Sequence, residues 1–178
     1  MSGERAAQRA LDAYLVASAR IGDRKAFALL FRRWNGKLLA HAWRLLGDSE
    51  AAKDAVQDGW AEIVRGLPRL GDDGAFPPWA YRIVSRRCAR AIGRYVRDRK
   101  IEAAAEQAAD VSDDPPDLER LRREISALPP EQGAAIALFY LEEMSVAETA
   151  VALAVPAGTV KTRLMHARRK LRSVLEGE

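Results

Sequence analysis

Cysteine and histidine are scarce in this chain of 178 residues, which has one cysteine, Cys88, and two histidines, His41 and His166. A single cysteine excludes an internal disulfide, and these three residues lie too far apart in the sequence to make a metal-ligand cluster of the usual spacing. We therefore expect no metal and no cofactor. We also expect a reducing compartment, the cytoplasm.

Long apolar runs are missing too. The first ten residues mix acidic and basic side chains, so neither a signal peptide nor a membrane span fits, and we expect no direct membrane insertion. The chain has no phosphate-binding glycine loop, and Cys88 lies on the apolar face of its expected helix with no histidine predicted nearby. These absences favour a protein that is not an enzyme.

Apolar residues recur at helical spacing along nearly the whole chain, and no segment has a convincing strand pattern. The sequence therefore predicts an all-α fold. Gly47 followed by Asp48 and Ser49 indicates a helix end and a polar N-cap, so the first two long helices should form a hairpin. Residues 67–78 (LPRLGDDGAFPP) are rich in turn residues and predict a loop before a third long helix.

Charge is distributed unevenly along the chain. Residues 79–100 hold eight basic residues and one acid, residues 101–120 one basic residue and seven acids, and residues 157–172 six basic residues and no acid. The acidic stretch contains the sequence DDPP at 113–116, which a continuous helix cannot cross. It predicts a flexible acidic linker over 101–117, with a reach of about 60 Å if extended, nearly two turns of duplex DNA at about 34 Å per turn.

The chain should accordingly form two small helical domains. We predict an N-terminal extension over 1–20, a first domain over 21–100, the linker over 101–117 and a second domain over 118–178.

The second domain has the pattern of a helix-turn-helix. Ser145 and Glu148 form a capping box, which predicts a short helix from Val146 to about Ala154, and Pro156 suits the first turn of the next helix. In that next helix an apolar series should face the core: Val160, Leu164, Ala167, Leu171 and Val174. The outer face then carries Lys161, Thr162, Met165, His166 and Arg169, as a helix in the major groove requires. A solvated basic face is the alternative.

Several segments carry a resemblance to one family. The segments LPPEQ, GTVKTRL and ARRKL resemble region 4 of the extracytoplasmic-function (ECF) sigma factors of the sigma-70 family. The segments GDRKAFALLFRRW, LLGDSEAAKDAVQD and FPPWAYRI resemble region 2 of the same family. The resemblance implies an alternative sigma factor that binds core RNA polymerase, directs it to promoters through minus-35 and minus-10 elements, and aids DNA melting.

The same resemblance implies the partners. They are promoter DNA and core RNA polymerase, which region 2 contacts at the clamp helices of the largest subunit and region 4 at the flap of the second-largest. An anti-sigma factor is common in the family, although no residue of the chain indicates one. Asp54, Gln57 and Asp58 match the polymerase-binding motif and share one helix face at i, i+3 and i+4. An ordinary solvated patch is the alternative for these three residues.

Region 2 of the family also handles the minus-10 element. Arg82, Arg86, Arg87, Arg90, Arg94 and Arg97 occupy a sector of roughly 140° on the third helix and should attract phosphates. Phe76, Trp79 and Tyr81 are candidates for stacking on unpaired bases, with a core position as the alternative for Trp79. In the family the preceding loop captures a flipped base, which makes residues 70–75 candidates for that pocket. Arg86 and Arg90 stand where the family usually has asparagine and aspartate, so the base preference should differ.

Region 4 of the family reads the minus-35 element. The matching positions here are Thr159, Lys161, Thr162, Arg163, Met165, His166 and Arg169, with Arg163, Arg168 and Arg169 expected on phosphates. Gly133 inside a predicted helix and Ala154 in place of the usual turn glycine depart from the family. One rival is a sigma mimic that occupies an anti-sigma factor without touching DNA, and another is an ordinary helix-turn-helix repressor, which would not explain the DAVQD segment.

Overall fold

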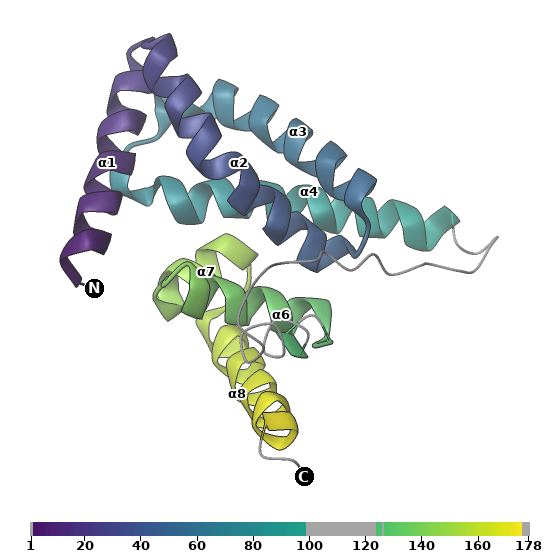
Figure 1. Ribbon diagram of the computed structural model, residues 1–178. Coiled ribbons are helices and arrows are strands. Elements are labelled where there is room, and N and C mark those ends of the chain that lie inside the picture. Colours follow the sequence, from purple (N-terminus) through teal and green to yellow (C-terminus); the bar gives the residue numbers. More distant parts are fainter. Residues whose placement is uncertain (1, 99–123, 126, 176–178) are drawn as a thin grey trace, which may run out of the picture.

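The structure, a computed structural model, describes residues 2–98, 124–125 and 127–175 and has no strand among them (Figure 1). The N-terminal bundle consists of α1 (Ser2–Arg20), α2 (Arg24–Leu46), α3 (Ser49–Gly66) and α4 (Phe76–Asp98), with the short 3-10 turns η1 (Leu67–Arg69) and η2 (Asp73–Ala75) before α4. The C-terminal bundle consists of α6 (Pro130–Ile136), the π-helical segment η3 (Ala137–Leu141), α7 (Val146–Leu153) and α8 (Ala157–Leu175). The all-α prediction is confirmed, and the predicted linker over 101–117 lies outside the described residues.

Local capping sets the ends of α2 and α3. Asp23 caps the start of α2 with its side chain, and α2 ends at Gly47, which takes the left-handed conformation with φ 67°. The Asp48 carboxylate then accepts a hydrogen bond from the backbone N–H of Ala51 at 2.6 Å, so α3 begins at once. The predicted helix end and N-cap are confirmed, and α2 and α3 form the expected hairpin.

Two elements differ from the sequence-based expectation. Residues 1–20, predicted only as an extension, contribute α1, which packs on α2 and is fixed there by Arg33 Nε donating to Asp12 Oδ1 at 2.8 Å. The loop predicted to reach residue 78 ends earlier, because α4 begins at Phe76. Pro77 and Pro78 lie in the first turn of α4, where a missing N–H removes no helical hydrogen bond.

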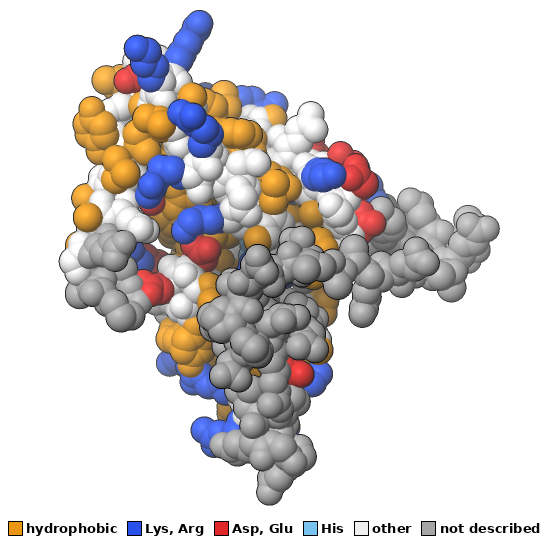
Figure 2. Space-filling model, in the orientation of Figure 1, with side chains coloured by type: hydrophobic (Ala, Val, Ile, Leu, Met, Phe, Trp, Pro, Cys, Tyr) orange, Lys and Arg blue, Asp and Glu red, His pale blue; other side chains and the backbone are white. Residues whose placement is uncertain are grey.

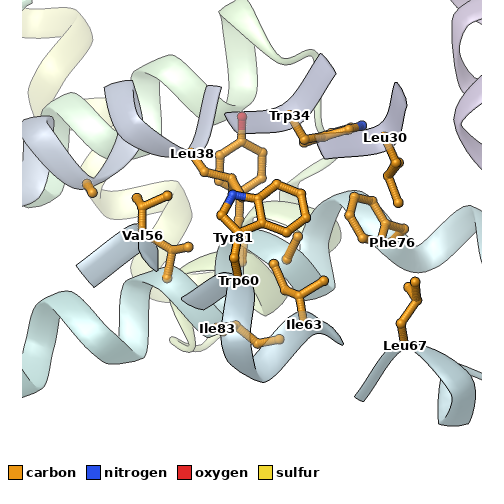
Figure 3. Close-up of a cluster of buried hydrophobic side chains, with 14 of the residues drawn as sticks. Leu30, Trp34, Leu38, Val56, Trp60, Ile63, Leu67, Phe76, Tyr81 and Ile83 are labelled. Carbon is orange, nitrogen blue, oxygen red and sulfur yellow. The ribbon is translucent and has the colours of Figure 1, made fainter. Parts of the chain in front are cut away.

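Figure 3 shows the aromatic and aliphatic side chains that fill the N-terminal bundle. They come from three helices and one turn: Leu30, Trp34 and Leu38 of α2, Val56, Trp60 and Ile63 of α3, Leu67 of η1, and Phe76, Tyr81 and Ile83 of α4. Gly59 and Gly66 let α3 and α4 approach closely. A Cβ at Gly59 would lie 3.0 Å from a methyl group of Val84, and one at Gly66 would lie 2.8 Å from the indole of Trp79.

The C-terminal bundle contains the predicted helix-turn-helix. Ser145 and Glu148 make both hydrogen bonds of the capping box, at 3.1 and 2.7 Å, and α7 begins at Val146 as expected. Ala154 ends α7 with φ 54°, a left-handed conformation. The carbonyl of Pro156 accepts from the first turn of α8, so Pro156 lies just before that helix. The bundle has its own small core of Leu128, Ala135, Ile136, Val160, Leu164 and Ala167.

The two bundles pack against each other. The core of the N-terminal bundle extends without a break to Leu138, Met144 and Ala152, because α7 lies along α4 and α6 lies beside α2 (Figure 1). Two ion pairs border this contact: Lys37 Nζ lies 2.7 Å from Glu142 Oε2, and Arg9 of α1 lies 3.4 Å from Glu148 of α7. The described chain is therefore closed, with the C-terminal bundle docked on α1, α2 and α4.

Candidate nucleic-acid interface

An acidic face runs along the outside of α3. Asp54, Gln57 and Asp58 are all exposed, and their spacing places them on one side of the helix, as the sequence predicts. Figure 2 shows acidic side chains gathered where α3 begins. The Asp58 carboxylate also lies 3.8 Å from the guanidinium of Arg87 on α4. The face is open to solvent and suits a basic partner surface.

A row of exposed arginines lies on α4. Arg82, Arg86, Arg90 and Arg94 are all exposed, and the C-terminal bundle, which packs on another side of α4, leaves them open. We call these four residues the arginine row. A polyanion is the partner that such a row attracts, because each phosphate contact releases counterions.

Arg87 does not belong to the arginine row. Its Nε and Nη2 donate to Glu62 Oε2 of α3 at 3.1 and 2.6 Å, so it joins the two helices. Helical periodicity placed Arg87 with the phosphate-binding arginines, but this acidic partner on α3 holds its guanidinium. The side chain of Arg97 lies outside the described residues.

The three candidate stacking residues occupy different environments. Phe76 and Tyr81 are 0% and 1% exposed, and both rings pack against Trp34 in the core at centroid distances of 5.4 and 5.8 Å. The prediction that these two rings stack on bases is wrong for this structure, since neither presents a face to solvent. Trp79 is half-buried over Gly66, which leaves it as the one candidate of the three with accessible surface.

The loop before α4 is ordered by its own acids. The Asp72 carboxylate accepts from the N–H of Gly74 at 2.9 Å, and the Asp72 carbonyl accepts from the N–H of Ala75 at 3.1 Å. Arg20, the last residue of α1, reaches Asp73 with a 2.6 Å ion pair. Sequence reasoning missed Arg20, because 53 residues separate the two and no periodic pattern links them.

The outer face of α8 is accessible as predicted. Its exposed residues are Lys161, Thr162, Met165, His166 and Arg169, and Met165 retains 57% of its surface. The face combines cations with hydrogen-bonding groups and one apolar side chain, which are the groups that read base edges.

Two of the other candidates on α8 have side-chain partners within the bundle. Arg163 Nη2 donates to Glu131 Oε2 at 2.7 Å, and Arg168 Nε donates to the hydroxyl of Tyr140 at 2.8 Å. The half-buried Thr159 lies in the first turn of the helix, beside the buried Val160. Arg163 thus fixes α8 to α6, and Arg168 fixes it to η3. Of the three arginines expected on phosphates, Arg169 is the best placed for one.

The nucleophilic and metal-binding potential of the described residues is low. Cys88 is fully buried, and burial raises the pKa of its thiol to about 12, so the reactive thiolate is strongly disfavoured. No group of three or more His, Cys, Asp and Glu side chains in the described ranges is arranged to hold a metal ion. None of the helices described has the length and hydrophobicity that a bilayer crossing needs.

Comparison with known proteins identifies both bundles. Residues 30–100 match the family described as Sigma-70 region 2, and residues 118–171 match Sigma-70, region 4. The ECF RNA polymerase sigma factor SigM of Mycobacterium tuberculosis is 35% identical over 173 residues, covering 92% of this chain and 84% of that protein. The RNA polymerase sigma-H factor of Pseudomonas aeruginosa is 29% identical over 181 residues, covering 93% of this chain and 94% of that protein.

Solved structures agree. The structure of CnrH in complex with the cytosolic domain of CnrY aligns with a TM-score of 0.63 at 27% identity, covering 94% of this chain and 99% of that one. The sigma factor RpoE of Bartonella quintana, in complex with the anti-sigma factor NepR, aligns with a TM-score of 0.67 at 23% identity, covering 85% of this chain and 98% of that one, and supports the fold. The chain belongs to the ECF sigma factors of the sigma-70 family and is an alternative sigma factor that directs RNA polymerase to promoters.

Proposed function

We propose that three faces of the chain divide the work of promoter recognition. The acidic face of α3, with Asp54, Gln57 and Asp58, binds the clamp of the polymerase. The arginine row of α4 holds the minus-10 region, and the outer face of α8 reads the minus-35 element. One observation supports this division above the others: two cationic helix faces, one on each bundle, are exposed together with the acidic face of α3.

At the minus-10 element the arginines supply attraction and the loop supplies selectivity. Phosphate contacts by Arg82, Arg86, Arg90 and Arg94 act on any sequence and depend steeply on salt. Selectivity then falls to Trp79 and to the loop over 70–75, because Phe76 and Tyr81 are in the core. Arg86 and Arg90 replace the asparagine and aspartate usual in the family, and we expect the base preference to change with them.

At the minus-35 element Lys161, Thr162, Met165 and His166 are placed to contact bases. Arg169 contacts a phosphate. Arg163 is less available for DNA contact, because its guanidinium is paired with Glu131 and its side chain is only 18% exposed.

Promoter binding requires the closed chain to open. The docked bundles hold α4 and α8 in one fixed arrangement, whereas two promoter elements lie on separate turns of the duplex. We propose that core polymerase separates the bundles, which then bind two elements at once and gain from the high effective concentration of the second contact. The chain acts in the cytoplasm, where it contributes binding energy and strand separation. The polymerase catalyses RNA synthesis.

The closed chain has a second proposed partner, an anti-sigma factor. The solved relatives CnrH and RpoE are in complex with the cytosolic domain of CnrY and with the anti-sigma factor NepR. We propose a protein of this class as the factor that holds the chain away from polymerase. We expect the chain to co-purify with one such protein. Addition of core polymerase should release the chain from it.

Run-off transcription on a library of promoter templates tests the proposed function. Core polymerase with the purified chain should select templates that share two short elements, and the selection should weaken as salt rises. A sigma mimic would give no selection and no salt-dependent shift of promoter DNA in the presence of core polymerase. Failure to initiate at any template would refute the proposal.

A further inference from the structure

The loop over 70–75 is short, and two neighbouring aspartates, Asp72 and Asp73, set most of its shape. Their carboxylates make different contacts. Asp72 uses its carboxylate and its carbonyl to fold the turn η2 onto itself, by hydrogen bonds to the N–H groups of Gly74 and Ala75. The carbonyl of Asp73 likewise accepts from the backbone N–H of Phe76, where α4 begins. The Asp73 carboxylate, in contrast, reaches out of the loop and accepts from Nη1 of Arg20 at 2.6 Å. One acid therefore folds the loop, and the other ties it to a different helix.

Arg20 is held in an unusual setting. It is the last residue of α1, and its side chain and that of Asp73 are 29% and 28% exposed, so water screens the pair only in part. Its Nε is buried and has no hydrogen-bond partner among the described residues. A buried unsatisfied donor lowers stability. The 2.6 Å pair with Asp73 fixes the position of this guanidinium and, with it, that of the loop.

The pair also changes the charge that the loop presents. Asp72 and Asp73 are two carboxylates in the loop before α4, the helix that carries the arginine row. A free Asp73 carboxylate beside a nucleotide would repel its phosphate. The Arg20 guanidinium neutralises that carboxylate and draws it toward α1. Leu70, Gly71 and the N-terminal end of α4 with Trp79 are left to face an incoming base, while the N–H of Gly74 holds the Asp72 carboxylate on the turn.

We infer that Arg20 is a positioning residue for minus-10 recognition, which holds the 70–75 loop in its base-accepting shape through Asp73. The inference rests on the proposed function, since it assumes that this loop receives an unpaired promoter base. Arg20 acts through the loop and need not touch DNA. Its ion pair keeps a carboxylate out of the site and fixes the loop to the end of α1, so that no ordering of the loop is needed when the base arrives.

Binding of single-stranded DNA by the holoenzyme tests the role. The probe is a labelled oligonucleotide with the non-template strand of the minus-10 region of a promoter selected in the run-off library. Arg20→Ala should weaken its binding to holoenzyme by about tenfold, the loss expected when a charge-assisted hydrogen bond is removed. Asp73→Asn should weaken it by a similar factor, and the double variant should be no weaker than either single variant, because both changes break one contact.

Three measurements separate positioning from a general loss of structure. Arg24→Ala, which removes an exposed cation four residues away, is the matched control and should bind the probe as the wild type does. Affinity for core polymerase and for a duplex with only the minus-35 element should be unchanged in Arg20→Ala. If Arg20→Ala does not fold, Asp73→Asn provides the same test from the other side of the pair.

The outcomes distinguish the inference from the proposed function. Wild-type holoenzyme that initiates selectively, with Arg20→Ala and Asp73→Asn binding the probe normally, overturns the role of Arg20 alone. Additive losses in the double variant overturn it as well, since they show that the two residues act separately. Wild-type holoenzyme that initiates at no template of the run-off library refutes the proposed function itself.

Discussion

Lys37 of α2 and Glu142 of the turn before α7 form an ion pair across the two bundles, with Nζ and Oε2 separated by 2.7 Å. The residues are 105 positions apart. Glu143, the next residue, has φ 54°, and its carbonyl oxygen accepts from Arg9 of α1 at 3.4 Å. A left-handed backbone is unfavourable for glutamate, so this turn stores strain at the point where the C-terminal bundle meets α1 and α2.

Reversing the charge of Lys37 should shift the closed chain toward the open form. Lys37→Glu places two carboxylates together, and we expect the ratio of open to closed forms to rise by about two- to fivefold, because exposed pairs contribute only about 0.2–1 kcal/mol. The radius of gyration from small-angle X-ray scattering should increase. Lys37→Glu combined with Glu142→Lys should return the wild-type value. An unchanged radius in Lys37→Glu would show that the apolar contact of Met144 and Ala152 alone decides closure.

His41 should make the stability of the chain depend on pH. Burial, assisted by the nearby Arg44 cation, lowers the pKa of this imidazole from 6.5 to about 3, and Nε2 lies 2.8 Å from the hydroxyl of Ser85. Because the folded state excludes a proton that the unfolded state binds below pH 6.5, stability falls as pH decreases from about 6.5 toward 3. Between pH 7 and 5 the loss from this residue should be about 2 kcal/mol.

Urea unfolding at pH 7 and at pH 5 measures this effect. His41→Gln removes the titrating group and keeps a polar side chain near Ser85, so the free energy of unfolding should change less with pH than in the wild type. The exposed His166 offers the control, since His166→Gln should retain the full pH dependence. If the free energy of unfolding fell by the same amount from pH 7 to pH 5 in the wild type and both variants, the pH dependence would not come from His41.

Replacing Ala154 by glycine should stabilise the folded chain. It has φ 54°, which is left-handed, and glycine adopts this conformation without the steric penalty of a Cβ. Ala154→Gly should raise the free energy of unfolding by about 1 kcal/mol. The exposed Ala147 in the first turn of α7 is a matched control, because Ala147→Gly should lower stability by about 0.5–1 kcal/mol. Chemical denaturation of the three proteins provides the comparison.

Much of this fold is readable from local signals. The capping box of Ser145 and Glu148, the end of α2 at Gly47 and the apolar series from Val160 to Ala167 all act within a few residues, and each is found where it is predicted. Gly133 departs from the helical pattern for a reason that only the fold shows. A Cβ there would lie 3.3 Å from the carbonyl oxygen of Ile125.

The wrong predictions of site residues share one cause. Periodicity gives the face of a helix but not what lies across from it, so Arg87 was grouped with the arginine row although Glu62 of α3 holds it. Likewise Phe76 and Tyr81 have the residue type that stacks on bases and equally the type that fills a core, and contacts with Trp34 decide between them. Ion pairs between distant segments, such as Arg20 with Asp73, leave no trace in a local pattern.

Asp58 should be needed for binding to core polymerase. Asp58→Arg reverses one of the two charges of the acidic face of α3, and we expect the affinity for core polymerase to fall by at least about tenfold, as for one partner of a charge pair at an interface. Glu50→Arg makes the same change near the start of α3 and should have a smaller effect. Competition with the wild type for core polymerase measures both. Equal affinity of Asp58→Arg and wild type would remove Asp58 from the interface.

His166 should set the preference at one base pair of the minus-35 element. The residue is exposed on the outer face of α8 beside Met165, where an imidazole can hydrogen-bond to a base edge. His166→Ala should reduce discrimination at that pair by about 1–3 kcal/mol while other positions keep their preference. Selection of duplexes randomised over the minus-35 element reads out each position separately. Arg169→Ala is the comparison, because loss of a phosphate contact weakens binding to all sequences alike and lowers its salt dependence. If His166→Ala gave that uniform loss, the imidazole would contact the backbone and base reading would pass to Lys161 and Thr162.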